Sequence, residues 1–247
     1  MPSVRRVSAA CAATLPLAVL LTGCVSTQTV AARARLVDAR IIASQSSTEV
    51  TQADPSVSVG VPAVIRDHTA NAIVVTVRND SGRALTDLPI SVGVRTHSGR
   101  ENYLNRSADL GYFERHIASI GSRAATTWVF ITVARIPPGR VFATVGVAQL
   151  HPSLSRSLPS ITVSLRTTQP ERDDQVTLNV SIVNRSAIPQ YNLPIYAVAL
   201  RGHREVAAGR TTLAHVGTNA ATTSTLELLG SFHYDSLRLI ASPTIFN

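Results

Sequence analysis

Three histidines in the C-terminal half are the residues best suited by type to chemistry in this chain. His203, His215 and His233 could converge, and three imidazoles can hold a zinc ion that keeps one position open for water or substrate. Histidines scattered over strands more often lie on the surface, so no metal ligand is predicted. A metal carrier or an envelope enzyme that uses these histidines stays an alternative. His203-Arg204-Glu205 has the order of the zinc deaminase motif but lacks its cysteine pair, which favours a charged hairpin turn after Gly202.

The composition removes several kinds of catalytic chemistry. All 23 basic residues are Arg, whereas a Schiff base or a phosphate-binding P-loop needs Lys. The two cysteines are Cys11 and Cys24, near the N-terminus, and the only methionine is Met1. The motifs of zinc proteases, serine hydrolases, dinucleotide-binding enzymes and EF-hands are missing from the sequence. We therefore predict no catalytic residue, no cofactor and a protein that is not an enzyme.

A cluster of aromatic and arginine residues in the first half is the best candidate for a binding patch. Both residue types are favoured at recognition surfaces, and loops at the ends of β-sandwiches commonly carry binding. The alternative is that the aromatic residues belong to the core of a strand, and the sequence does not separate the two. The predicted patch consists of Tyr103, Arg106, Tyr112, Phe113 and Arg115.

The N-terminal segment has the order of a secretory leader. Arg5 and Arg6 precede an apolar run from 7 to 21, and Leu21-Thr22-Gly23-Cys24 follows. This tetrapeptide resembles the lipobox of bacterial lipoproteins. The resemblance implies a signal peptide over 1–23, a lipid on Cys24, and a chain held at the extracytoplasmic face of the cell membrane. An uncleaved membrane span is the alternative, but the run is shorter than the ~18 to 20 residues that a span needs.

The next segment, 24–54, is predicted to be a tether, with a short helix as an option. Its Arg33, Arg35 and Arg40 could each add about 1 kcal/mol of attraction to anionic lipid headgroups, or could be solvated linker charges. The stretch 44–54 is rich in Ser, Thr and Gln, which is typical of a flexible connection.

Short phrases occur twice in the same order along the rest of the chain. Val75-Thr76-Val77-Arg78-Asn79 is echoed by Val180-Ser181-Ile182-Val183-Asn184, and a Leu-Pro-Ile phrase follows each at the same interval. A phrase around Pro55 and a glycine phrase at Gly121 have similar echoes at Pro159 and Gly217, and the first copy carries an extra stretch around 97–116. A period of this length indicates duplicated domains. We predict domains over 55–150 and 159–247, joined by a polar linker over 151–158 that few contacts cross.

Each copy has the alternation of β-strands. Val176, Leu178, Val180 and Ile182 alternate with more polar residues, which predicts one face turned to a core. The Asn that ends each such strand is predicted to shape a turn, because Asn tolerates positive φ and its side chain can mimic a backbone turn. The Leu-Pro-Ile phrase is predicted to open the next strand, where a missing N–H does least harm. The predicted fold class is all-β, with two tandem antiparallel immunoglobulin-like β-sandwich domains.

The progression of alternating strand, Asn-x-Ser turn and Leu-Pro-Ile strand resembles the bacterial surface domains called CARDB and FxLYD. The similarity covers most of each repeat and rests on turns and strand starts. It implies a sandwich fold and an extracellular compartment, with an adhesive or unassigned role.

Charge and compartment narrow the predicted partners. Removal of Arg5 and Arg6 with the leader lowers the net charge from +8 to +6, and the remaining arginines are dispersed. We predict no nucleic acid partner, since the arginines form no basic stripe and the lipid places the chain outside the cytoplasm. The expected partners are the membrane, through the lipid, and an envelope protein or glycan. A non-enzymatic binding, adhesive or scaffolding role is the leading hypothesis, and an accessory subunit of an envelope transport complex is a further alternative.

Overall fold

The computed structural model describes residues 49–50, 52–107, 109–147, 158–170 and 176–245. In this part of the chain every paired strand is antiparallel, and the described residues contain no α-helix. The prediction of an all-β chain of antiparallel sandwich type is confirmed. None of the helical structure described is long and apolar enough to cross a membrane.

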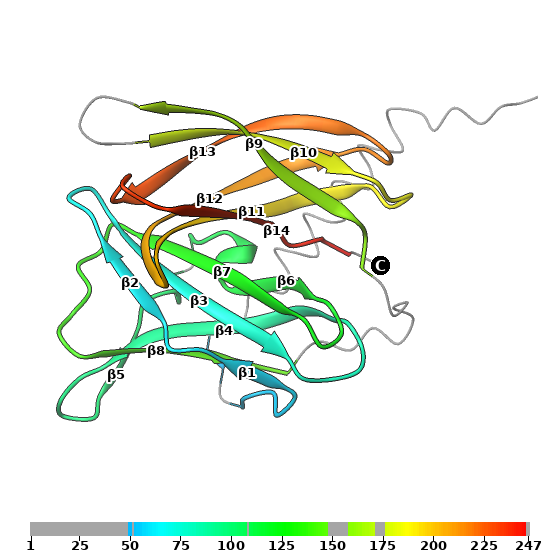
Figure 1. Ribbon diagram of the computed structural model, residues 1–247. Coiled ribbons are helices and arrows are strands. Elements are labelled where there is room, and N and C mark those ends of the chain that lie inside the picture. The colour runs from blue at the N-terminus through cyan, green and yellow to red at the C-terminus, as the bar shows by residue number, and fades with distance from the viewer. Residues whose placement is uncertain (1–48, 51, 108, 148–157, 171–175, 246–247) are drawn as a thin grey trace, which may run out of the picture.

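The first eight strands form two sheets, which we call the N-terminal unit (Figure 1). In one sheet β3 pairs with three neighbours, and in the other β4 does so. The first sheet contains β1 (Val57–Val59), β2 (Ala63–Arg66), β3 (Asn71–Asn79) and β7 (Ala125–Thr132). The second contains β4 (Leu85–Arg95), β5 (Glu101–Tyr103), β6 (His116–Ile120) and β8 (Arg140–Val145).

The last six strands form the C-terminal unit, a sheet in the order β14-β11-β12-β13-β10-β9 that folds over on itself. Its link between β12 and β13 is only two residue pairs long, and β9 lies against β14 at the open side. At the corner, a Cβ on Gly209 would lie 2.0 Å from the Glu227 carbonyl oxygen, so the close approach of β12 and β13 requires glycine. The strands are β9 (Ile161–Pro170), β10 (Val176–Asn184), β11 (Gln190–Arg201), β12 (Arg204–Val216), β13 (Ala221–Gly230) and β14 (Ser236–Ala241).

The pattern of strand pairing in the N-terminal unit recurs in the C-terminal unit. Val57 pairs with Asn79 at the start of β1, and Ile161 pairs with Asn184 at the start of β9. By the same pairing pattern β3 corresponds to β10, β4 to β11, β7 to β13 and β8 to β14. Two continuous strands of the C-terminal unit are each divided into two strands in the N-terminal unit. β9 corresponds to β1 and β2, and β12 corresponds to β5 and β6.

The asparagine that ends β3 or β10 fixes the same turn in both units. Asn79 and Asn184 are fully buried, and each Oδ1 accepts hydrogen bonds from the backbone N–H and the hydroxyl of the serine two residues on. Each Nδ2 donates to two carbonyl oxygens across the turn, on Arg83 (2.7 Å) and Gly121 (2.9 Å) or on Ile188 (2.8 Å) and Gly217 (2.9 Å). The structural interpretation of these asparagines is confirmed.

The Leu-Pro-Ile phrases lie inside strands, which corrects the prediction that they open them. β4 begins at Leu85 and β11 at Gln190, so each proline has strand residues on both sides. Asp87 (φ 54°) and Asn192 (φ 49°) are skipped in the pairing with the neighbouring strand. Each proline closely follows this gap in the pairing, where the ladder is already interrupted and a missing N–H is tolerated.

The extra stretch of the first copy lies between β5 and β6 and contains a short 3₁₀-helix, η2 (Tyr112–Glu114). The buried side chain of Asn105 makes hydrogen bonds to the backbone of β4 that a neighbouring strand would otherwise make. It accepts a hydrogen bond from the Val92 N–H (2.8 Å) and donates to the Ile90 carbonyl oxygen (2.8 Å). The insertion is therefore bonded into the sheet edge that it interrupts.

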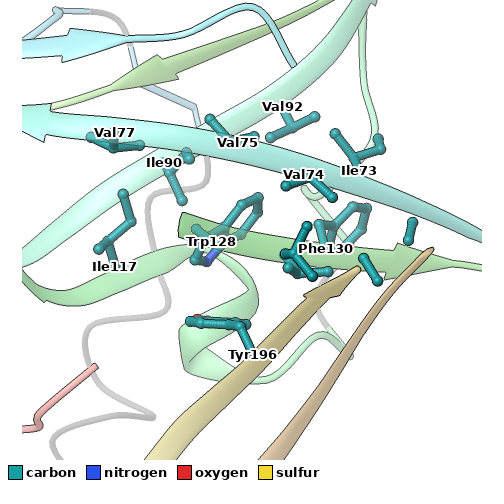
Figure 2. Packing of buried hydrophobic residues seen from close by; sticks show 14 of the residues in the cluster. Ile73, Val74, Val75, Val77, Ile90, Val92, Ile117, Trp128, Phe130 and Tyr196 are labelled. Atoms are coloured by element: carbon teal, nitrogen blue, oxygen red, sulfur yellow. The ribbon is translucent and has the colours of Figure 1, made fainter. Parts of the chain in front are cut away.

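One apolar cluster includes residues of both units, which corrects the expectation that few contacts cross between them. Trp128 and Phe130 of β7 belong to the same buried cluster as Tyr196 and Val198 of β11, and Figure 2 shows Tyr196 beneath Trp128. The opposite face of β11 packs into a second cluster within the C-terminal unit. β11 is thus buried on both faces. The domain limits 55–150 and 159–247 stay a prediction.

Polar contacts also join the two units. The Ser242 hydroxyl accepts a hydrogen bond from the Ser119 N–H (3.2 Å) and donates to the Ser119 carbonyl oxygen (3.0 Å). Arg210 of β12 lies 3.1 Å from the Glu114 carboxylate of η2, and both side chains are largely buried. Opposite Arg210 in the ladder, Tyr196 is fully buried, and this burial raises the pKa of its hydroxyl.

The folded body begins earlier than the tether prediction placed it. The Val50 N–H donates to the Ser91 hydroxyl (2.8 Å), Ala53 forms a β-bridge with Gly146, and the Asp54 N–H donates to the Val145 carbonyl oxygen (2.9 Å). The predicted leader over 1–23, the lipidation residue Cys24 and most of the linker over 151–158 lie outside the described residues.

Candidate functional site: a groove between the two units

Three residues of the predicted binding patch are buried and support the fold. The Tyr112 ring stacks on His116 with centroids 4.0 Å apart, and the Phe113 carbonyl oxygen accepts a hydrogen bond from the Trp128 indole (3.0 Å). Arg115 is 4% exposed, and its guanidinium donates to the Leu110 carbonyl oxygen (3.2 Å). The five predicted residues therefore do not form one exposed surface.

The other two patch residues reach the surface. The Tyr103 hydroxyl donates to the Glu101 carboxylate (3.1 Å), and its ring packs edge-on against Phe142. Partial burial, and then the neighbouring carboxylate, raise the pKa of Tyr103. Arg106 is exposed and lies 3.4 Å from the Glu49 carboxylate. A role in recognition stays a prediction for Tyr103 and Arg106.

Burial of His116 makes stability depend on pH. Burial lowers the pKa of His116 and outweighs the nearby Asp87 carboxylate and the hydrogen bond to the Tyr112 carbonyl oxygen, which both raise it, while Arg115 lowers it further. The unfolded chain, with an ordinary pKa near 6.5, thus binds a proton at a higher pH than the folded chain does. Above the unfolded pKa, His116 is neutral in both states and does not lower stability. As the pH falls from the unfolded pKa towards the lower folded pKa, the unfolded chain gains the proton first and stability is lost.

We expect the denaturation midpoint to fall between pH 7.5 and pH 5, and to fall less in a His116→Gln variant. His203→Gln is the matched control, because His203 is exposed in a turn. Urea unfolding of the three proteins at both pH values measures the difference. An equal loss of stability in wild type and His116→Gln would contradict the assignment.

The three histidines proposed as an alternative metal site do not converge. His203 directly precedes β12, and His215 stands at its far end, about 40 Å away at ~3.3 Å per residue. His215 packs beside the Tyr191 ring, and His233 beside the Phe232 ring. Among the described residues no three His, Cys, Asp or Glu side chains are grouped for a metal ion. The three histidines therefore do not form one metal site.

A groove of about 810 Å³ opens where turns of the two units meet. The β2–β3 turn forms one wall, and the β11–β12 and β13–β14 turns form the other, on the left side of Figure 1. Its volume lies within the range of small-molecule sites. The lining residues are Val64, Ile65, Arg66, Asp67, His68, Arg201, Arg204, Glu205, Val206, Gly230, Ser231, Phe232 and His233.

Asp67 holds the two walls together. Its Oδ2 accepts a hydrogen bond from the Gly230 N–H of the other unit (3.1 Å), and its Oδ1 accepts one from the Thr69 N–H (3.1 Å). Burial acts to raise the pKa of Asp67, but these hydrogen bonds outweigh it and lower the pKa. A Cβ on Gly230, where φ is 107°, would lie 2.6 Å from Ile65 Cγ2, so glycine permits the close approach of the walls.

Three arginines line the groove, and none of them forms an ion pair with a carboxylate of the described residues. Arg201 and Arg204 lie directly opposite one another in the β11–β12 hairpin. Arg201 turns to the His233 carbonyl oxygen, to which its Nε donates (3.0 Å). Arg66 and Arg204 are exposed, and within the described ranges neither guanidinium lies within 4.0 Å of a carboxylate. The groove therefore presents two guanidinium groups that are available to an anion.

Only part of this groove could be predicted from the sequence. The charged hairpin turn after Gly202 is confirmed, since Gly202 has a φ of 59° between β11 and β12. What brings Arg204 near Arg66 is the packing of the units, and their positions are 138 residues apart in the chain. A single sequence has no local pattern that reports this juxtaposition.

Comparisons with known proteins give no family. No protein-family model matches the chain. No curated protein matches it either. A crystal structure of red sea bream transglutaminase is similar over 81% of the chain, with 14% identity and a TM-score of 0.24, and the chain spans 32% of that protein. A likeness this low carries no argument about activity.

Proposed function

We propose that the protein is a lipid-anchored component of the cell envelope, displayed on the extracytoplasmic face of the membrane, with a binding role and no catalytic one. The observation that carries the proposal is the order of basic residues, apolar run and Leu21-Thr22-Gly23-Cys24 ahead of a β-sandwich body. A lipid on Cys24 would concentrate the folded units at the membrane surface.

The groove supports a binding role for the folded part of the protein. It lies at the seam of two units that share an apolar cluster, and its walls are joined through Asp67 and Gly230. The boundary between two units can present fixed side chains from several turns to one ligand. Ligand sites commonly occur at such boundaries. Catalysis would need a nucleophile, an acid–base pair or a metal centre, and the histidines that were the candidates for one lie apart.

The anchor is tested by metabolic labelling with an alkyne analogue of palmitate in a bacterium that processes lipoproteins. Wild type is expected to be labelled and to sediment with membranes, because two acyl chains or more give stable anchoring. Cys24→Ser is expected to lose all label, and Cys11→Ser, which changes the other cysteine of the leader region, is expected to keep it. Labelling is the deciding measurement, since an uncleaved leader can itself hold the chain at a membrane. Label retained by Cys24→Ser would reject the anchor.

A further inference from the structure

We infer that the groove between the units binds an anionic glycan, a saccharide that bears carboxylate or phosphate groups. Its anionic oxygen atoms would be bound by Arg66 and Arg204, and a sugar ring would lie against Phe232. The inference rests on the proposed binding role, of which it names the ligand class. It does not depend on the lipid at Cys24, because all three side chains line a groove formed by the folded body.

The arginine pair at the hairpin is the first reason for an anion. Like charges that face one another across a strand pair are destabilising unless a counter-charge lies nearby. Arg201 and Arg204 face one another in this way, and the carbonyl oxygen that accepts from Arg201 is neutral. The Asp235 carboxylate lies at the same turn, but it accepts a hydrogen bond from the Gly202 N–H (2.7 Å) and forms no ion pair with either arginine. A bound carboxylate or phosphate would supply the counter-charge. Guanidinium groups bind both anions through two parallel hydrogen bonds.

The acidic residues of the groove do not neutralise its arginines. Asp67 accepts a hydrogen bond from the Gly230 N–H at one oxygen and from the Thr69 N–H at the other, and the His68 imidazole lies 2.9 Å from its carboxylate. Glu205 lines the groove, but it lies more than 4.0 Å from any guanidinium in the described ranges. Three arginines against these two carboxylates leave an excess of positive charge before either imidazole is protonated.

Phe232 is the reason for a saccharide in place of a simple anion. Its side chain is one of the few large apolar groups exposed on the described surface, at 40%, and its ring packs beside His233 with centroids 4.4 Å apart. The negative face of an aromatic ring attracts the partly positive C–H groups of a sugar. Ser231 adds a hydroxyl at the same wall. An aromatic ring that lines the same groove as two guanidinium groups matches a charged sugar, which carries both kinds of surface.

The ligand class is tested by isothermal titration calorimetry on the full-length protein in detergent. The probes are trigalacturonate, its neutral methyl ester, mannose 6-phosphate and citrate. Binding of trigalacturonate or mannose 6-phosphate, with the methyl ester and citrate at least about tenfold weaker, is expected and identifies the anion as carboxylate or phosphate on a sugar. Equal binding of citrate would overturn the glycan assignment, and no binding of either charged sugar would overturn the inference.

Variants locate the site. Arg66→Gln and Arg204→Gln are each expected to weaken binding about tenfold, since each removes a charge-assisted hydrogen bond. Phe232→Ala is expected to weaken binding severalfold. Arg166→Gln, which makes the same change on exposed β9, is the matched control and is expected to leave affinity within about twofold. Equal weakening by Arg166→Gln would show diffuse attraction and overturn the site. Cys24 labelling in the same preparation tests the anchor separately.

Discussion

Replacing Asn79 or Asn184 with alanine is expected to lower the free energy of unfolding by about 3 kcal/mol in each case. Each amide is fully buried, and its oxygen and nitrogen together satisfy a serine N–H, a serine hydroxyl and two carbonyl oxygens. Alanine would remove the hydrogen bonds that these partly buried groups make to the amide. A buried polar group left unpaired costs more than the net value of the hydrogen bond that it loses.

The matched control is Asn179→Ala, in the same strand as Asn184. Asn179 donates one exposed hydrogen bond, to the Thr167 hydroxyl (3.1 Å), so its replacement is expected to cost less than about 0.5 kcal/mol. Urea denaturation followed by far-ultraviolet circular dichroism measures all three variants. If Asn79→Ala were as stable as Asn179→Ala, the turn would not depend on the amide.

The asparagine turns show what the sequence predicts well. Their residue type, their place at the end of an alternating strand and their recurrence at a fixed interval all reflect local backbone chemistry, and the structure reproduces each of these features in both units. Strand alternation also identified the inward face of β10, where Leu178, Val180 and Ile182 are fully buried. Local backbone geometry depends on residues that are neighbours in the chain, so it can be predicted from a single sequence.

The contact between the units shows what alternation misses. Leu193-Pro194-Ile195-Tyr196-Ala197-Val198-Ala199-Leu200 is apolar at consecutive positions, and such a run is typical of a strand buried on both faces. The run indicates burial of the second face, but it does not say what covers that face. The cover is β7 of the other unit, an arrangement set by packing between residues far apart in the chain.

Burial of three residues of the predicted binding patch was not apparent from the sequence for a similar reason. Aromatic and arginine side chains are favoured both at recognition surfaces and beneath loops, and composition does not separate the two. Tyr112 and Phe113 are buried within the insertion because η2 places them against β6 and β7, and Arg115 donates to the Leu110 carbonyl oxygen. The groove arginines gave no such signal, since each lies at the end of a strand of its own unit, next to an ordinary turn.

Replacing Val198 with aspartate is expected to destabilise both units together. Val198 is 3% exposed on the face of β11 that joins the cluster of Trp128, so the variant buries an unpaired carboxylate at the contact. The expected loss is about 4 kcal/mol of unfolding free energy. Val133→Asp makes the same substitution at a side chain that is 86% exposed, and it is expected to change stability by less than about 0.5 kcal/mol.

Trp128 allows the coupling between the units to be measured, because it is the only tryptophan and it belongs to the N-terminal unit. Its fluorescence reports the unfolding of that unit, whereas circular dichroism reports both. In Val198→Asp the two transitions are expected to shift together to lower urea, since the altered side chain lies in the cluster that contains Trp128. A fluorescence midpoint equal to that of wild type, with only the dichroism transition shifted, would mean that the shared cluster contributes no stability to the N-terminal unit.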